Sequence, residues 1–162
     1  MGNSMVQLQL EEVKSFLGES VERIGSYLNN TTIHMLLEEQ SGDEAYYTSL
    51  LATVRRLAVY CEEGFDACKI VLSNSPFHKG AAEKTLYKVF HQCIEEFFSP
   101  KNDAWFEDSR SAYTGKNSIK YHHPVPASFS SLIKDLEGSF QNIREELEYY
   151  ETDYRTKMLQ SK

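Results

Sequence analysis

Residues 43–72 read DEAYYTSLLATVRRLAVYCEEGFDACKIVL, and this stretch predicts one long amphipathic helix. Its apolar side chains recur in steps of three and four, which places them on one helical face. They are Tyr47, Leu50, Val54, Leu57, Cys61, Cys68 and Val71. Gly64 falls on this face where a larger side chain is expected, at a cost of about 1 kcal/mol relative to alanine. We therefore expect another helix to approach closely at Gly64.

Three more long helices are predicted on either side of this stretch. Apolar residues follow the same periodicity over residues 4–28, 79–98 and 128–158. A short helix follows Thr31 or Thr32, either of which can cap its first turn, and Ser41-Gly42 ends it. The sequence thus predicts an all-α protein, a bundle of four long helices plus one short helix, in a single domain over residues 1–162.

Residues 99–127 form an insert without a helical pattern before the last helix. Two alternating runs, residues 111–114 and 118–122, flank a glycine-containing turn and predict a small β-hairpin. Long non-helical segments inside compact domains are often functional. The insert mixes aromatic and basic residues, so it is a candidate surface for a partner or ligand. That surface comprises Trp105, Arg110, Tyr113, Lys116, Lys120, Tyr121 and His122, together with Tyr149 of the last helix.

Nucleic-acid binding through the insert is one alternative function. Aromatic side chains interleaved with basic ones can stack on bases and neutralise phosphates. However, Asp103, Glu107 and Asp108 nearly offset the positive charges of the insert, and the whole chain carries a formal net charge of −7. Such a field repels phosphate. Neither nucleic acid nor an anionic membrane surface is therefore expected as a partner.

A metal site is the other alternative, because two strings repeat one arrangement. Residues 34–39 read HMLLEE and residues 91–96 read HQCIEE. In each, a histidine and a glutamate are four residues apart and leave the same helical face. If the two helices faced each other, His34, Glu38, His91 and Glu95 would supply a plausible ligand set for zinc, manganese or iron. Two ordinary i, i+4 contacts would produce the same pattern.

The end of the last helix favours a protein partner over either alternative. Residues 145–154 read EELEYYETDY, an acidic and tyrosine-rich segment. If these turns extend past the bundle, they offer an apolar stripe to another protein or to a second copy of the chain, and tyrosine is common at such surfaces. The sequence carries no P-loop, dinucleotide-binding or nucleophile-elbow motif. We therefore expect no cofactor and a non-enzymatic interaction or scaffold protein.

The expected location is the cytoplasm. No run of 18 apolar residues predicts a membrane span, and residues 1–6 lack the features of a signal peptide. The three cysteines, Cys61, Cys68 and Cys93, form no C-x-x-C pair and occupy apolar helical positions. They are expected to be buried, unpaired thiols in a reducing compartment.

Four strings resemble a known family. Residues 86–98, 100–103, 113–120 and 145–157, together with the chain length, resemble the YpuI-like proteins of Bacillus-type bacteria. This resemblance spans nearly the whole chain. It implies a bacterial cytosolic protein, and because no activity is established for the family, it assigns no catalytic residues.

Overall fold

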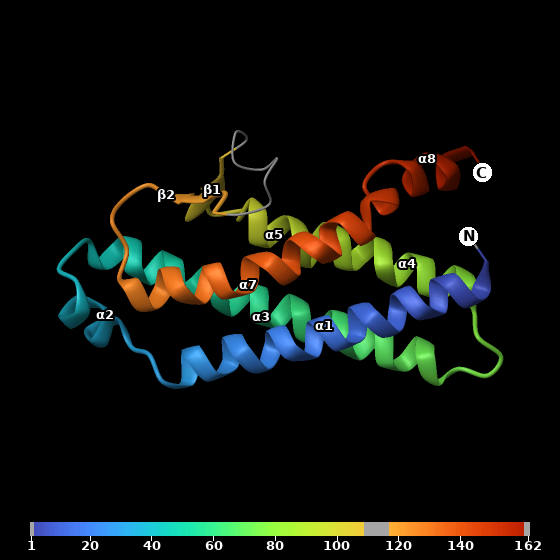
Figure 1. The fold of residues 1–162 in the computed structure, drawn as a ribbon, viewed down its shortest axis with the longest axis horizontal. Helices are drawn as coiled ribbons and strands as arrows, with labels where there is room; N and C mark the ends of the chain where they lie inside the picture. The colour runs from blue at the N-terminus through green and yellow to red at the C-terminus, as the bar shows by residue number, and fades with distance from the viewer. Residues whose placement is uncertain (1, 109–116, 161–162) are drawn as a thin grey trace.

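The computed structural model describes residues 2–108 and 117–160, and it is a helical bundle with a small antiparallel sheet (Figure 1). The bundle consists of α1 (Asn3–Asn29), α3 (Glu44–Ser73), α4 (Lys79–Val89) with its continuation, and α7 (Ala127–Glu146), while the short α2 (Ile33–Glu39) lies at one end. The prediction of an all-α fold with a hairpin insert is confirmed. No helix in the described part of the chain is long and apolar enough to cross a membrane.

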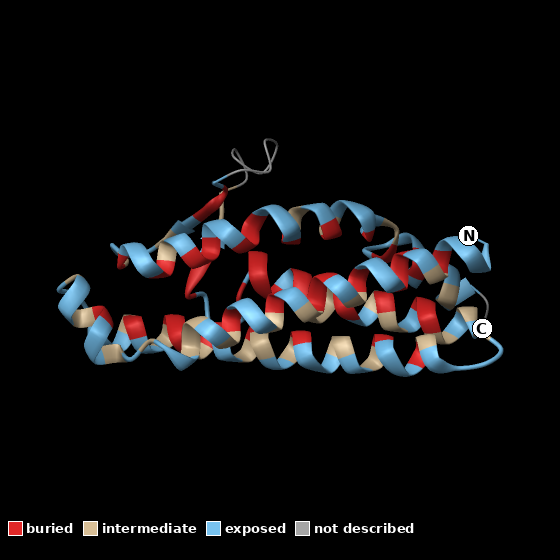
Figure 2. Cartoon of the chain, turned by 60° about the horizontal axis from the view of Figure 1, so that its bottom comes forward, coloured by how far each residue is buried: buried red, intermediate tan, exposed pale blue. Residues whose placement is uncertain are grey.

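Helix α3 packs along α1, and the apolar stripe that its sequence predicts faces the core. Its apolar stripe is buried, and the inner faces of the surrounding helices are buried against it (Figure 2). A Cβ atom added at Gly64 would lie 3.0 Å from Leu17 of α1 and 3.3 Å from Val89 of α4. Two helices therefore approach α3 closely at Gly64, whereas the sequence predicts the approach of one. All three cysteines are free and buried.

Polar side chains cap the first turns of α2 and α3, and the sequence predicts the first of these two caps. The Thr32 hydroxyl accepts a hydrogen bond from the Met35 amide at 3.1 Å and starts α2. The Asp43 carboxylate accepts from the Ala45 and Tyr46 amides and starts α3. Amides in a first helical turn have no partner within the helix, so these side chains fix where each helix begins.

The helix predicted over residues 79–98 is not a continuous α-helix. A π-helical segment, η1 (Phe90–Ile94), separates α4 from α5 (Glu95–Phe98). The apolar positions in η1 are still buried, so the extra residue per turn is accommodated by packing. Short π-helical segments often occur at functional sites.

The predicted last helix is also interrupted. Helix α7 ends at Glu146, a 3₁₀ turn η2 (Glu148–Tyr150) follows, and α8 (Asp153–Gln160) resumes. Leu147, Tyr150 and Tyr154 are buried despite the break, so their apolar spacing could not reveal it. Carboxylates at the C-terminal end of a helix meet the negative end of its dipole and repel one another, which disfavours continuing α7 through this acidic segment.

The hairpin exists, but its first strand lies earlier than predicted. Strand β1 (Trp105–Glu107) pairs antiparallel with β2 (Ile119–Tyr121), with Trp105 opposite Tyr121. The run predicted at residues 111–114 falls outside the described residues. The sheet is anchored to the bundle by Trp105, whose indole N–H donates to the Phe97 carbonyl at 2.6 Å. This carbonyl is in the last turn of α5 and has no amide ahead of it in the helix to accept from.

Candidate partner-binding site

The four predicted metal ligands are held as two separate pairs. The His34 and Glu38 side chains lie 2.8 Å apart on α2, and His91 and Glu95 lie 2.8 Å apart where η1 meets α5. Helix α2 is at one end of the bundle, whereas α5 is near its middle (Figure 1). Within residues 2–108 and 117–160, no three His, Cys, Asp or Glu side chains gather in a way that could hold a metal ion. The structure does not bring the two pairs into one cluster.

The predicted partner surface is divided by the fold. Trp105 is wholly buried, because its ring packs against Phe129 and its N–H donates to the Phe97 carbonyl at the end of α5. The prediction that Trp105 belongs to an exposed partner surface is therefore wrong. Lys120 and His122 are exposed, and Tyr121 is half-buried. The remaining insert members, Arg110, Tyr113 and Lys116, fall outside the described residues.

Tyr149 belongs to a cluster of tyrosines at the C-terminal end of the chain. Its ring centroid lies 5.0 Å from that of Tyr150 and 6.2 Å from that of Tyr154, which in turn contacts Tyr87 of α4. Burial raises the pKa of Tyr149 above its ordinary value, and the neighbouring carboxylate of Glu83 adds to this. Tyr154 thus joins α8 to α4, and Tyr149 packs against Tyr154.

His91 joins η1 to the interrupted C-terminal helix. Its Nδ1 faces Glu95 at 2.8 Å and its Nε2 faces the backbone carbonyl of Tyr150 at 3.2 Å. Its ring also contacts Tyr87, with 4.4 Å between centroids. The two irregular segments, η1 and η2, are therefore in direct contact.

Next to this contact lies an acidic pocket of about 370 Å³. Phe90, Ile94 and Phe98, all nearly buried, contribute apolar surface to it. Five glutamates also line it: Glu95, Glu107, Glu145, Glu148 and Glu151. They come from four parts of the chain, namely α5, β1, the end of α7, and η2 with the residue that follows it. The π-helix, the hairpin and the break in the last helix therefore meet at one cavity.

Arg144 is the cation of the acidic pocket. Its guanidinium donates to both carboxylate oxygens of Glu107, at 2.9 and 2.6 Å, and its carbon lies 3.6 Å from the centre of the Phe98 ring. Gln141 accepts from the Nε of the same side chain at 3.0 Å. Both members of the Arg144–Glu107 pair are largely shielded from solvent. Since this pair is neutral, the other four glutamates give the pocket its negative charge.

The sequence identifies part of this pocket. Glu95 belongs to a predicted pair. Glu145, Glu148 and Glu151 lie in the segment expected to meet a partner, but that contact was expected through its apolar stripe, and the structure buries Leu147, Tyr150 and Tyr154 of this stripe instead. Glu107 and Arg144 were not predicted, because 37 residues separate them and each looks like an ordinary surface charge. Their only local signal is that Arg144 directly follows the buried Ile143 of α7.

Comparison with known proteins identifies a family and no activity. A family model described as "Protein of unknown function (DUF3907)" matches residues 10–156. The chain is 46% identical over 151 residues to the "Uncharacterized protein YpuI" of Bacillus subtilis (strain 168), an alignment that covers 93% of this chain and 84% of that protein. No solved structure shows a significant match. The resemblance to YpuI-like proteins is thus confirmed, and the chain belongs to the DUF3907 family of proteins of unknown function.

Proposed function

We propose that this protein is a non-enzymatic interaction protein whose acidic pocket binds arginine or lysine side chains of a protein partner. The observation that carries the proposal is the composition of the pocket, in which carboxylates surround buried aromatic side chains. Long basic side chains have an apolar stem and a charged end. The stem can lie on Phe90 and Ile94, since Arg144 already covers Phe98, while the charge meets the carboxylates.

Arg144 supports the proposal by example. It lies over the Phe98 ring and forms a two-pronged ion pair with Glu107, which is how guanidinium groups are commonly held. Glu148 and Glu151 are exposed, and their carboxylates form no hydrogen bond or ion pair with another residue in the described part of the chain. A partner arginine could therefore bind beside Arg144 in the same manner.

The other expected occupant, a second copy of this chain, fits the pocket less well. The chain has a formal net charge of −7, so two copies repel each other at long range. A basic partner is attracted instead, and its association is accelerated.

We also propose a cytoplasmic location, because a reducing compartment keeps thiols such as that of Cys61 free, as they are in this structure.

A labelled tetra-arginine peptide tests the proposal by fluorescence anisotropy at low salt. The double variant Glu148→Gln, Glu151→Gln removes two charges from the pocket and is expected to weaken binding roughly tenfold. The matched control is Glu11→Gln, Glu12→Gln, which removes two exposed charges from α1 outside the pocket. An equal loss in the control contradicts the proposal, because the peptide would then bind only to the general negative field.

A further inference from the structure

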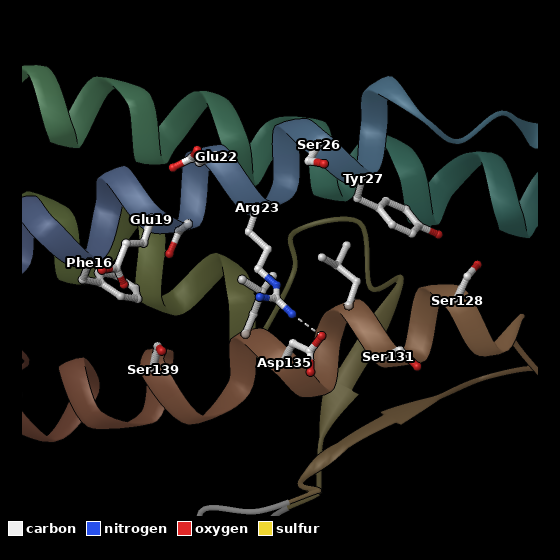
Figure 3. Close-up of a pocket in the computed structure, with 13 residues that line it drawn as sticks. Phe16, Glu19, Glu22, Arg23, Ser26, Tyr27, Ser128, Ser131, Asp135 and Ser139 are labelled. Carbon is white, nitrogen blue, oxygen red and sulfur yellow. Dashed lines mark hydrogen bonds and ion pairs between the residues drawn. The ribbon is translucent and has the colours of Figure 1, made fainter.

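A second cavity lies between α1 and α7 (Figure 3). This α1–α7 groove has a volume of about 710 Å³ and shares no lining residue with the acidic pocket. Its walls are residues 16–27 of α1 and residues 128–139 of α7, about three turns of each helix. Its volume falls in the range of small-molecule sites, about 300 to 1,000 Å³.

The groove is open because small hydroxyl residues line both walls. Ser20 and Ser26 come from α1, and Ser128, Ser131 and Ser139 come from α7. Leucine or phenylalanine at these positions would fill the space between the helices. Underneath, the buried side chains of Phe16, Leu132 and Leu136 close the groove toward the core. The result is a hydroxyl-rich channel on an apolar base.

The hydroxyl of Ser20 points to a ligand, because it has no hydrogen-bond partner among the described residues. Its side chain is only 3% exposed, lines the groove, and makes no hydrogen bond to any residue in the described part of the chain. The Ser20 oxygen is not sealed from solvent and opens onto the groove, and a hydroxyl without a partner in the protein bonds to whatever occupies the space in front of it. A polar group bound in the groove would supply the missing partner.

The charges of the groove restrict the kind of ligand. Arg23 of α1 and Asp135 of α7 form an ion pair across the groove (Figure 3). Arg23 is therefore already neutralised, and Glu19 and Glu22 line the same wall. This arrangement disfavours a phosphate or carboxylate ligand. A wholly apolar ligand would cover the other serine hydroxyls without giving them partners, since among these serines only Ser128 bonds within the described residues, to Glu39.

A neutral molecule that carries many hydroxyl groups meets both conditions. Its hydroxyls donate and accept as serine hydroxyls do. Neighbouring hydroxyls also match the spacing of a carboxylate or a guanidinium, such as those of Asp135 and Arg23. We propose that the α1–α7 groove binds a neutral oligosaccharide or a similar polyhydroxylated ligand. This goes beyond the proposed partner binding and does not depend on it.

Calorimetric titration of the full chain with maltotetraose and with chitotetraose tests this site. Ser20→Ala is expected to weaken binding of the sugar that binds wild type by roughly fivefold, the value of one hydrogen bond. The same variant should be no less stable than wild type, because it loses no hydrogen bond within the protein and alanine favours a helix. Ser15→Ala is the control, since it makes the same change at an exposed position of α1 outside the groove.

Three results would overturn the proposal. The first is that neither sugar binds to wild type. The second is that Ser20→Ala and Ser15→Ala bind equally well, which would place the sugar elsewhere. The third is that ATP binds more tightly than either sugar and that its binding depends on Ser20, which would show that the site prefers anionic ligands. None of these results bears on the tetra-arginine experiment, because the two sites share no residue.

Discussion

Two tyrosine hydroxyls of this protein have opposite surroundings. The Tyr46 hydroxyl donates to the Ala104 carbonyl at 2.8 Å and accepts from the His122 amide at 3.3 Å. The Tyr150 side chain is wholly buried, and its hydroxyl has no hydrogen-bond partner among residues 2–108 and 117–160. A hydrogen bond contributes about 1 kcal/mol to stability, whereas a buried polar group without one costs about 1 to 3 kcal/mol. The same substitution should therefore act in opposite directions at the two positions.

Phenylalanine substitutions test this difference by urea unfolding at neutral pH. Tyr46→Phe is expected to lower the free energy of unfolding by about 1 kcal/mol, because two hydrogen bonds are lost. Tyr150→Phe is expected to raise it by up to about 1 kcal/mol. A larger destabilisation by Tyr150→Phe than by Tyr46→Phe would show that the Tyr150 hydroxyl is bonded after all.

The pH dependence of Tyr150 follows from the same burial. Burial, with a smaller effect of Glu83, raises the pKa of Tyr150 above the usual 10.0. Above pH 10 the phenol ionises in the unfolded chain but stays protonated in the folded one. Ionisation therefore stabilises the unfolded state, and the free energy of unfolding falls as the pH rises. The stability advantage of Tyr150→Phe over wild type should therefore grow above pH 10. An advantage that shrinks there contradicts this assignment.

For the helices, the sequence predicts that each one exists and roughly where it begins and ends, but it does not predict where a helix is interrupted. The stripe of residues 43–72 gives α3 within a residue or two at each end, since its apolar periodicity is unbroken over this length. Apolar periodicity does not predict the π-helix η1 or the break at Leu147. In both places the buried residues keep spacings of three and four. These spacings do not distinguish a regular α-helix from one that is underwound, as in η1, or overwound, as in η2.

Gly64 offers a test of how closely three helices pack. Gly64→Val places side-chain atoms against Leu17 of α1 and Val89 of α4, and overpacking of this kind costs about 1 to 3 kcal/mol. Gly138→Val in α7 is the matched control, since nothing lies within 4 Å of a Cβ atom at that position. Denaturant midpoints should fall for the first variant and hold or rise slightly for the second. Similar midpoints for both variants would mean that the helices do not meet at Gly64.

At the scale of the molecule, the sequence predicts the fold class but only fragments of the acidic pocket. Glu95 and the acidic segment after Ile143 are visible as local patterns. Their convergence with Glu107 depends on how the hairpin docks, and that is fixed by contacts distant in sequence, such as Trp105 with Phe129. Partners that far apart leave no periodic signal in a single chain. For the same reason, the two His–Glu strings repeat in sequence without meeting in space.

The central claim is that the acidic pocket receives a basic side chain. The most direct test follows the methyl resonances of the full chain by NMR while the tetra-arginine peptide is added. We expect a saturable shift of the Ile94 methyl groups, which line the pocket, and no shift for Ile24, which is buried in α1 outside it. The Ile94 shift should be lost in the Glu148→Gln, Glu151→Gln variant. A bound peptide that leaves Ile94 unperturbed in wild type would show that the acidic pocket is not the binding site.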